Sequence, residues 1–132
     1  MPITTPTSGS RVNLVLLVSL VVVGVLCILC AEKYTMLKLR VAFADGQIAI
    51  FKDMEAAAGN TTVPRQMTAN LEYVVNYYPS GSKQVKGTRL DKIVEVARSN
   101  SIAAIVARLQ SATGKDSGND ARRWIKEYPP AN

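Results

Sequence analysis

The strongest constraint on this chain is an uninterrupted apolar run from Val12 to Ala31, which reads VNLVLLVSLVVVGVLCILCA and holds no charged residue. Arg11 and Glu32 close the run on either side. About 20 apolar residues in a helix cover the roughly 30 Å of hydrocarbon in a bilayer. A helix that is apolar on every face has no place in a small soluble domain. The sequence therefore predicts a transmembrane helix over 12–31.

A cleaved signal peptide is the main alternative for this run. Signal-peptide cleavage requires a small residue three positions before the cut. For the candidate cuts before Glu32, this position is occupied by Leu29 or Ile28. The run is also longer than the usual apolar centre of about 7 to 15 residues. A retained anchor is favoured, and a secreted helical domain that begins near Glu32 stays as the alternative.

Cys27 and Cys30 form a C-x-x-C pair, a spacing that often indicates metal or redox chemistry. The pair lies inside the apolar run, and the chain has no histidine to complete a zinc site. Leu26 and Leu29 precede the two cysteines, which disfavours lipidation. Packing in the membrane is the better interpretation, and no metal or cofactor is predicted.

The charges beside the run bear on its orientation. Lys33, Lys38 and Arg40 follow it, whereas Arg11 and the amino terminus precede it. Positive charges are retained on the cytoplasmic side. This count favours a cytoplasmic C-terminal part in a cell membrane.

The residues on either side of the run differ in character. Residues 1–11 are rich in Thr, Ser and Pro and predict a disordered tail. Residues 32–59 predict a juxtamembrane amphipathic helix that stops at Gly59-Asn60. Its apolar positions recur at heptad-like spacing, at Tyr34, Leu37, Val41, Ala44, Ile48 and Phe51. This seam either forms a coiled coil in a homodimer through 34–55 or folds back on later helices.

Residues 60–132 predict a small C-terminal helical domain. Pro64 opens a helix whose apolar face runs from Met67 to Tyr78, and Pro79 ends it. A second helix starts after Thr88, runs to Gly114, and has a possible interruption at 99–101. A third, short helix is capped by Asp120, and Trp124 and Tyr128 should dock it on the other two. The predicted fold class is all-α.

The connector before the second of these helices is basic, with Lys83, Lys86, Arg89 and Lys92. It lacks the order of a phosphate-binding P-loop, because Lys86 precedes Gly87 and no strand precedes the loop. Lysines beside a helix N-terminus attract anions, so these four residues are candidate anion-binding residues for lipid headgroups or nucleic acid. Nucleic acid is the less favoured ligand even at a net charge of +6, because the connector is too long for a helix-turn-helix.

Enzymatic chemistry is not predicted. The chain has no histidine and no G-x-S-x-G elbow, so no catalytic residue is proposed. The stretch from Asp116 to Asp120 lacks the EF-hand pattern and is better explained by capping. The predicted structural and interaction residues are Tyr77, Tyr78, Trp124 and Tyr128.

Two motifs carry a resemblance. LEYVVNYYPSGSKQVKGTRLDKIVE and TGKDSGNDARRWIKEY resemble segments of small, uncharacterised single-pass membrane proteins of planctomycete-type bacteria. The resemblance spans roughly 71–128 and implies a bacterial cell membrane and one folding unit, with no activity attached. Together with the apolar run, these patterns indicate a membrane-anchored adaptor or scaffold. Its expected partners are the bilayer and either a second copy or another membrane protein.

Overall fold

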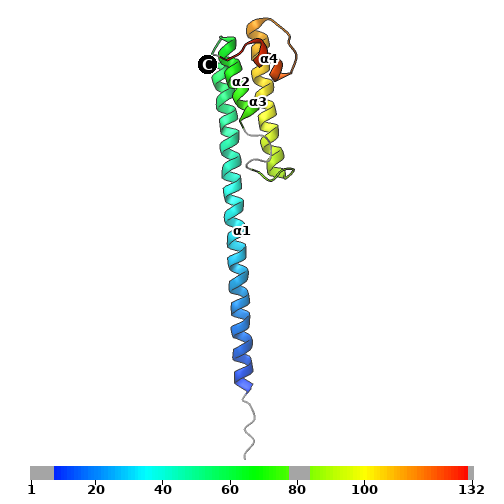
Figure 1. Cartoon of the computed structure of the whole chain (residues 1–132). Helices are drawn as coiled ribbons and strands as arrows, with labels where there is room; N and C mark the ends of the chain where they lie inside the picture. The colour runs from blue at the N-terminus through cyan, green and yellow to red at the C-terminus, as the bar shows by residue number, and fades with distance from the viewer. Residues whose placement is uncertain (1–7, 78–83, 131–132) are drawn as a thin grey trace, which may run out of the picture. The chain divides into compact units, whose positions relative to one another are not determined.

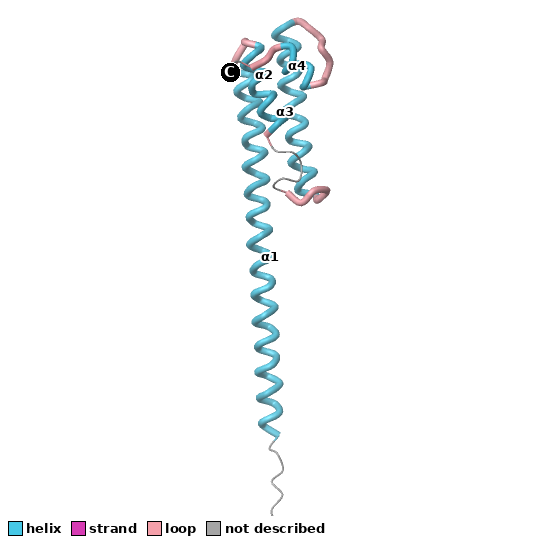
Figure 2. The backbone as a smooth tube through the Cα atoms, viewed as in Figure 1, coloured by secondary structure: helices cyan, strands magenta, loops and turns pink. Residues whose placement is uncertain are grey.

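The computed structural model describes residues 8–77 and 84–130, which form four helices (Figures 1 and 2). They are α1 (Ser8–Gly59), α2 (Pro64–Asn76), α3 (Arg89–Thr113) and α4 (Ala121–Glu127). No strand occurs in these described ranges, which confirms the all-α prediction. The chain divides into two compact units, Met1–Leu39 and Arg40–Asn132, here called the N-terminal unit and the helical unit.

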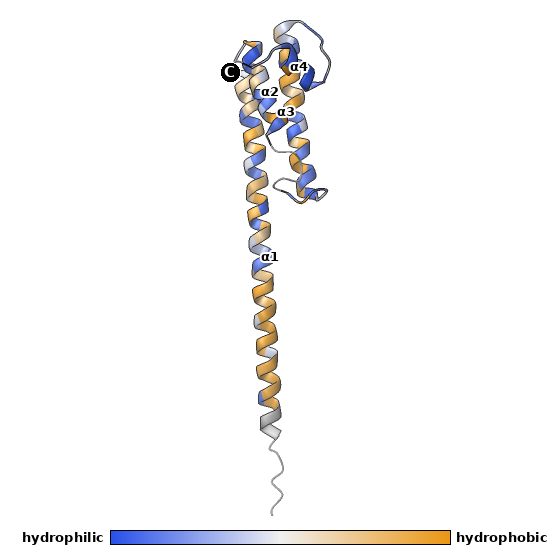
Figure 3. Cartoon of the chain, viewed as in Figure 1, coloured by the Kyte–Doolittle hydropathy of each residue, from blue (hydrophilic) through white to orange (hydrophobic). Residues whose placement is uncertain are grey.

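In the described residues, the N-terminal unit is the first part of α1, which contains the apolar run. This helix begins at Ser8, so the residues just before Val12 are helical rather than part of an irregular tail. Figure 3 shows the hydrophobic colour along most of this part of the helix. Its side chains are exposed, as at Leu20 (71%), and none of its most apolar window is buried within the protein. α1 is thus one helix that is long and apolar enough to cross a membrane.

The helical unit has a core to which all four helices contribute. The last part of α1 contributes Ala44, Phe51 and Ala58, and α4 contributes Trp124. The other buried apolar residues come from α2 and α3 and are Met67, Leu71, Val74, Val94, Ile105, Val106 and Leu109. The compact helical unit therefore starts at Arg40, whereas the sequence suggested a domain boundary at residue 60.

The seam predicted over 34–51 divides in two. Ala44 and Phe51 are fully buried and Ile48 packs against them, whereas Tyr34 and Leu37 are exposed. The later half thus folds back on the other helices of its own chain, one of the two arrangements that the sequence left open. A homodimer through the whole of 34–55 would have to expose this buried half.

Local signals set the helix ends. Pro64 occupies the first turn of α2, and the helix ends at Asn76 with Tyr77 as its C-cap. α3 ends at Gly114, whose φ of 66° lies in the left-handed region that glycine adopts without steric cost. α3 runs unbroken through 99–101, so the interruption considered there does not occur. Ser101 is instead buried, and its hydroxyl donates to Glu55 Oε2 at 3.1 Å.

The N-terminus of α3 is capped reciprocally. The Thr88 hydroxyl accepts from the Asp91 backbone N–H at 3.3 Å, and the Asp91 carboxylate accepts from the Gly87 N–H at 2.8 Å. Thr88 thus caps the helix that the sequence predicted to start after it. One donor of the first turn, the Asp91 N–H, and one donor just before the cap, the Gly87 N–H, are satisfied in this way.

We expect Thr88→Ala to lower the free energy of unfolding of the helical unit by about 1 kcal/mol, because the first turn of α3 loses its acceptor. Chemical denaturation of the full chain in detergent, followed by circular dichroism, measures the change. Thr62→Ala is the control, since Thr62 is exposed and outside any helix. An effect of equal size in the two variants would contradict the capping role.

Candidate functional site

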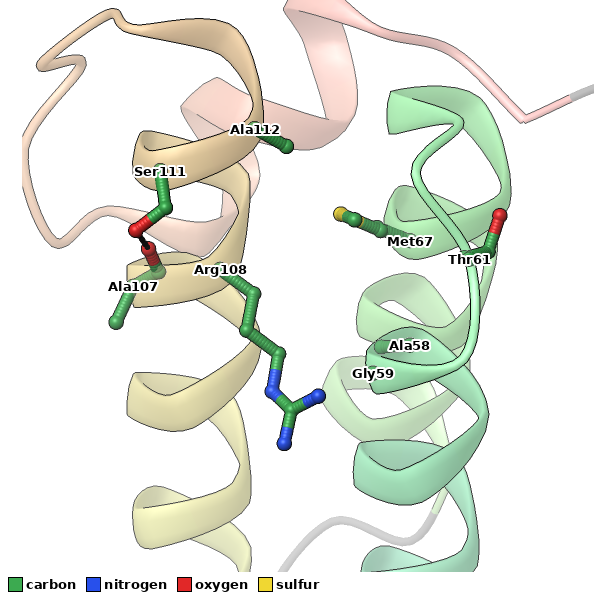
Figure 4. Close-up of a pocket in the computed structure, with 8 residues that line it drawn as sticks. All are labelled: Ala58, Gly59, Thr61, Met67, Ala107, Arg108, Ser111 and Ala112. Carbon is green, nitrogen blue, oxygen red and sulfur yellow. Dashed lines mark hydrogen bonds between the residues drawn. The ribbon is translucent and has the colours of Figure 1, made fainter.

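The first candidate site is a groove of about 390 Å³ between the end of α1 and the second half of α3 (Figure 4). Most of its lining residues are exposed, and Arg108 is its charged side chain. The Arg108 guanidinium lies so close to Gly59 that a Cβ at that position would fall 1.6 Å from Nη1. A cation is favoured at a helix C-terminus, where the dipole is negative. The Arg108 guanidinium therefore lies beside the C-terminus of α1, where a positive charge is favoured. The lining of the groove holds no acid–base pair suited to catalysis.

The second candidate site is the predicted anion-binding segment. Lys86, Arg89 and Lys92 are exposed around the start of α3. Within the part of the chain that the structure describes, none of the three forms an ion pair. Lys83 lies outside the described residues. The structure thus places three of the four basic residues at one end of one helix.

The structure also changes the reason for expecting an anion there. The Asp91 carboxylate is 5% exposed and bonds to the Gly87 N–H, so the helix terminus already holds an acid of its own chain. The Gly87 and Asp91 N–H groups are therefore already bonded within the chain. The attraction for an anion comes mainly from the three cationic side chains, which are exposed.

The third candidate set is aromatic. The Tyr77 ring is half-buried and stacks on that of Tyr73, with centroids 4.3 Å apart and planes at 21°. Tyr78 lies outside the described residues. Trp124 is fully buried, and its indole N–H donates to the Gly118 carbonyl at 2.8 Å. Its ring lies 6.1 Å from that of Tyr128, centroid to centroid.

Trp124 and Tyr128 fix α4 to the rest of the helical unit. The Thr68 hydroxyl of α2 donates to the Tyr128 carbonyl at 2.5 Å, and Trp124 belongs to the core shared by all four helices. The predicted docking of α4 is therefore present. It makes Trp124 a structural residue, since its fully buried ring offers no surface to a partner.

The acidic loop before α4 is also structural. Asp116 Oδ1 accepts from the Gly118 N–H at 3.0 Å, and the Asp120 side chain accepts from the Arg122 N–H at 3.0 Å. Both are local turn and cap bonds of the kind that Asp favours. Each carboxylate thus has a role in shaping the loop that Trp124 closes.

One ion pair links this loop to α4. Lys115 Nζ donates to Glu127 Oε1 at 2.7 Å, and the Ser117 hydroxyl donates to Glu127 Oε2 at 2.7 Å. The hydrogen bond from Lys115, followed by that from Ser117, lowers the pKa of Glu127 below its ordinary value of 4.5. The hydrogen bond to Glu127, followed by contact with Tyr128, raises the pKa of Lys115 above 10.5.

These shifts predict a pH dependence of stability. A lowered carboxyl pKa contributes stability above pH 4.5 that is lost as pH falls through the pKa of the folded state. The raised lysine pKa contributes stability below pH 10.5 that is lost as pH rises through the folded value. We expect Glu127→Gln to lower the Tm near neutral pH and to have much less effect well below pH 4.5. Exposed Asp53→Asn is the control, and equal Tm differences at both pH values would contradict the role of the pair.

Buried polar residues were missed by sequence reasoning. Gln47 and Gln84 are 6% and 5% exposed, and Gln84 Nε2 donates to the Arg40 carbonyl at 3.3 Å. This bond holds the residues before α3 beside the start of the helical unit. A glutamine in a basic, glycine-rich connector carries no signal for such burial. By contrast, T-x-x-D at Thr88–Asp91 was a readable capping signal.

No family model, no curated protein and no solved structure matches this chain. The resemblance over 71–128 therefore stays a prediction.

Proposed function

We propose that this protein is a membrane-anchored interaction protein, with α1 as a retained single-pass anchor and the helical unit as its exposed adaptor or scaffold module. The observation that carries the proposal is the exposure of the whole apolar segment, residues 12–31. Its leucines and valines, from Val12 to Leu29, are at least half exposed. Leaving so much apolar surface in water is costly at roughly 25 cal/mol per Å². A bilayer removes that cost along the full length of the segment.

Side chains near the end of the apolar segment support the same proposal. Tyr34 is 60% exposed, and Lys38 Nζ lies 4.7 Å from the centroid of its ring. Tyrosine is enriched where a span meets water, and lysine reaches from such positions toward headgroups. An exposed cation–π pair just after an apolar run suits a membrane interface.

The helical unit supports an interaction role rather than a catalytic one. The carboxylates of Asp91 and Asp120 accept from backbone N–H groups at the starts of α3 and α4, and the groove near Arg108 lacks an acid–base pair. In the described ranges, no group of three or more acidic, cysteine or histidine side chains is placed to hold a metal. The proposal therefore rests on surfaces, and it includes a cytoplasmic helical unit because Lys33, Lys38 and Arg40 follow the segment.

The anchor is tested by Val18→Arg combined with Val22→Arg. Each arginine at the centre of a span costs about 2.5 to 3.5 kcal/mol of insertion free energy, so the pair should move the protein out of the membrane fraction. Val41→Arg with Val63→Arg is the matched control, because both valines are exposed and lie outside 12–31. If both double variants remain equally in alkali-washed membranes, the segment is not the anchor.

The orientation is tested separately by a fusion of alkaline phosphatase after Asn132. This enzyme is active only outside the cytoplasm, so we expect an intact, membrane-bound and inactive fusion. Activity would place the helical unit outside and overturn the orientation without affecting the anchor.

A further inference from the structure

The start of α3 carries an exposed face in which apolar and cationic residues alternate. Val85, Ile93 and Val96 are 51%, 48% and 60% exposed. Arg89, Ile93 and Val96 recur at helical spacing, so they share one side of α3, and Lys92 is adjacent. We call these four residues, together with Val85 and Lys86 of the loop just before the helix, the docking face. Helices with basic and apolar residues on one exposed side are typical of membrane surfaces.

The two acidic residues in the first turns of α3 have partners within the chain. Asp91 is buried and bonds to the Gly87 N–H. Glu95 is half-buried and lies 3.7 Å from Arg98 Nε, oxygen to nitrogen. Asp91 is therefore turned inward, and the Glu95 carboxylate, whose side chain is 33% exposed, is paired with Arg98 rather than with the cations of the docking face. What the docking face presents to solvent is apolar and cationic.

The chain also limits how far this face can lie from the end of the apolar segment. Arg40 follows Ala31 by nine residues, and a fully extended chain of that length spans at most about 32 Å. Gln84 Nε2 bonds to the Arg40 carbonyl, so the residues that begin the docking face lie beside Arg40. This limit holds for every arrangement of the two units. A tether this short gives a weak surface contact a high effective concentration.

We propose that the docking face binds the anionic surface of the bilayer in which α1 is anchored, with Ile93 and Val96 entering the headgroup layer and the three cations facing lipid phosphates. The proposal rests on the proposed membrane anchor. It assigns the exposed start of α3 to acidic phospholipid headgroups. Binding there would hold the helical unit against the membrane and leave its opposite end, with α4, available to other partners.

The test places the full chain in lipid nanodiscs of phosphatidylcholine alone or mixed with phosphatidylserine. Cys27→Ala and Cys30→Ala remove the native thiols, and Asn100→Cys carries a polarity-sensitive fluorophore one turn beyond Val96. Asn100 is exposed, so labelling leaves the docking face unchanged. Ser111→Cys, exposed near the other end of α3, is the matched control. Quenching by neutral acrylamide reports shielding in either orientation.

We expect several-fold less quenching at position 100 in anionic discs than in neutral discs, a loss of this shielding in high salt, and no difference at position 111. Changing Lys86, Arg89 and Lys92 to Gln should weaken docking on the order of 100-fold, about fivefold per cation. Ile93→Ser with Val96→Ser should abolish the shielding while the protein stays in the discs.

Equal quenching of position 100 in the two kinds of disc, whether strong or weak, would overturn the proposal. Shielding of position 100 by a short DNA duplex in neutral discs would assign the face to nucleic acid instead. Incorporation into the discs is a separate readout of the anchor. A chain that enters neither kind of disc would overturn the anchor and, with it, the docking, whereas entry without shielding would overturn the docking alone.

Discussion

Trp124→Ala should lower the free energy of unfolding of the helical unit by about 3 to 5 kcal/mol, because the substitution leaves a large cavity in the core. Trp124 is fully buried among residues from all four helices, and its N–H donates to the Gly118 carbonyl. The total free energy of unfolding of a small domain is about 5 to 15 kcal/mol, so this loss would be a large part of it. The helix α4 and the loop from 114 to 120 should detach first.

Circular dichroism in detergent is the suitable measurement, since Trp124 is the single tryptophan and the variant loses that fluorescence. Trp124→Phe should cost less, because a ring remains while the bond to Gly118 is lost. Lys126→Ala on the exposed side of α4 is the control and should lie within about 0.5 kcal/mol of the wild type. A Trp124→Ala protein as stable as the Lys126→Ala protein would contradict the docking of α4.

Phe51→Ala should have a comparable effect, about 3 to 5 kcal/mol, although Phe51 lies on the same helix as the apolar segment. Phe51 is fully buried and belongs to the core that includes Leu71 and Ile105. If the part of α1 after Arg40 did not pack on the other helices, truncating this ring would leave the stability of α2 to α4 unchanged. The substitution therefore tests whether the helical unit begins at Arg40.

Val41→Ala is the control, because it also truncates an apolar side chain of the same part of α1, and this side chain is 41% exposed. We expect it to cost about 1 kcal/mol or less. Denaturation of both variants should be measured over a range of protein concentrations. A concentration-dependent loss in Phe51→Ala would indicate that the ring is buried between two copies rather than within one chain.

Sequence patterns predicted the helices well because their signals are local. Pro64 and Gly114 act through their own backbone torsions, and Thr88 and Asp120 bond within their own turns. The apolar run of α1 needs no tertiary information either. The burial of Trp124 was expected because a large aromatic on a short helix has few other ways to leave water.

The partners of each face were less predictable. The seam from Tyr34 to Phe51 has the same periodicity throughout, yet only its later half is buried, because burial depends on where α2 and α3 lie. The charges at 83–92 pointed to an anion site, but the sequence did not reveal that Asp91 occupies the helix terminus. The docking face can be recognised only when the burial of Asp91 and Gln84 is known.

The proposed function requires that α1 remains part of the protein and holds it in a membrane. The measurement is the intact mass of the chain recovered from alkali-washed membranes. We predict a membrane-bound protein whose mass includes residues 12–31. A soluble chain with an N-terminus near Glu32 would contradict the proposed function and identify the apolar segment as a cleaved signal.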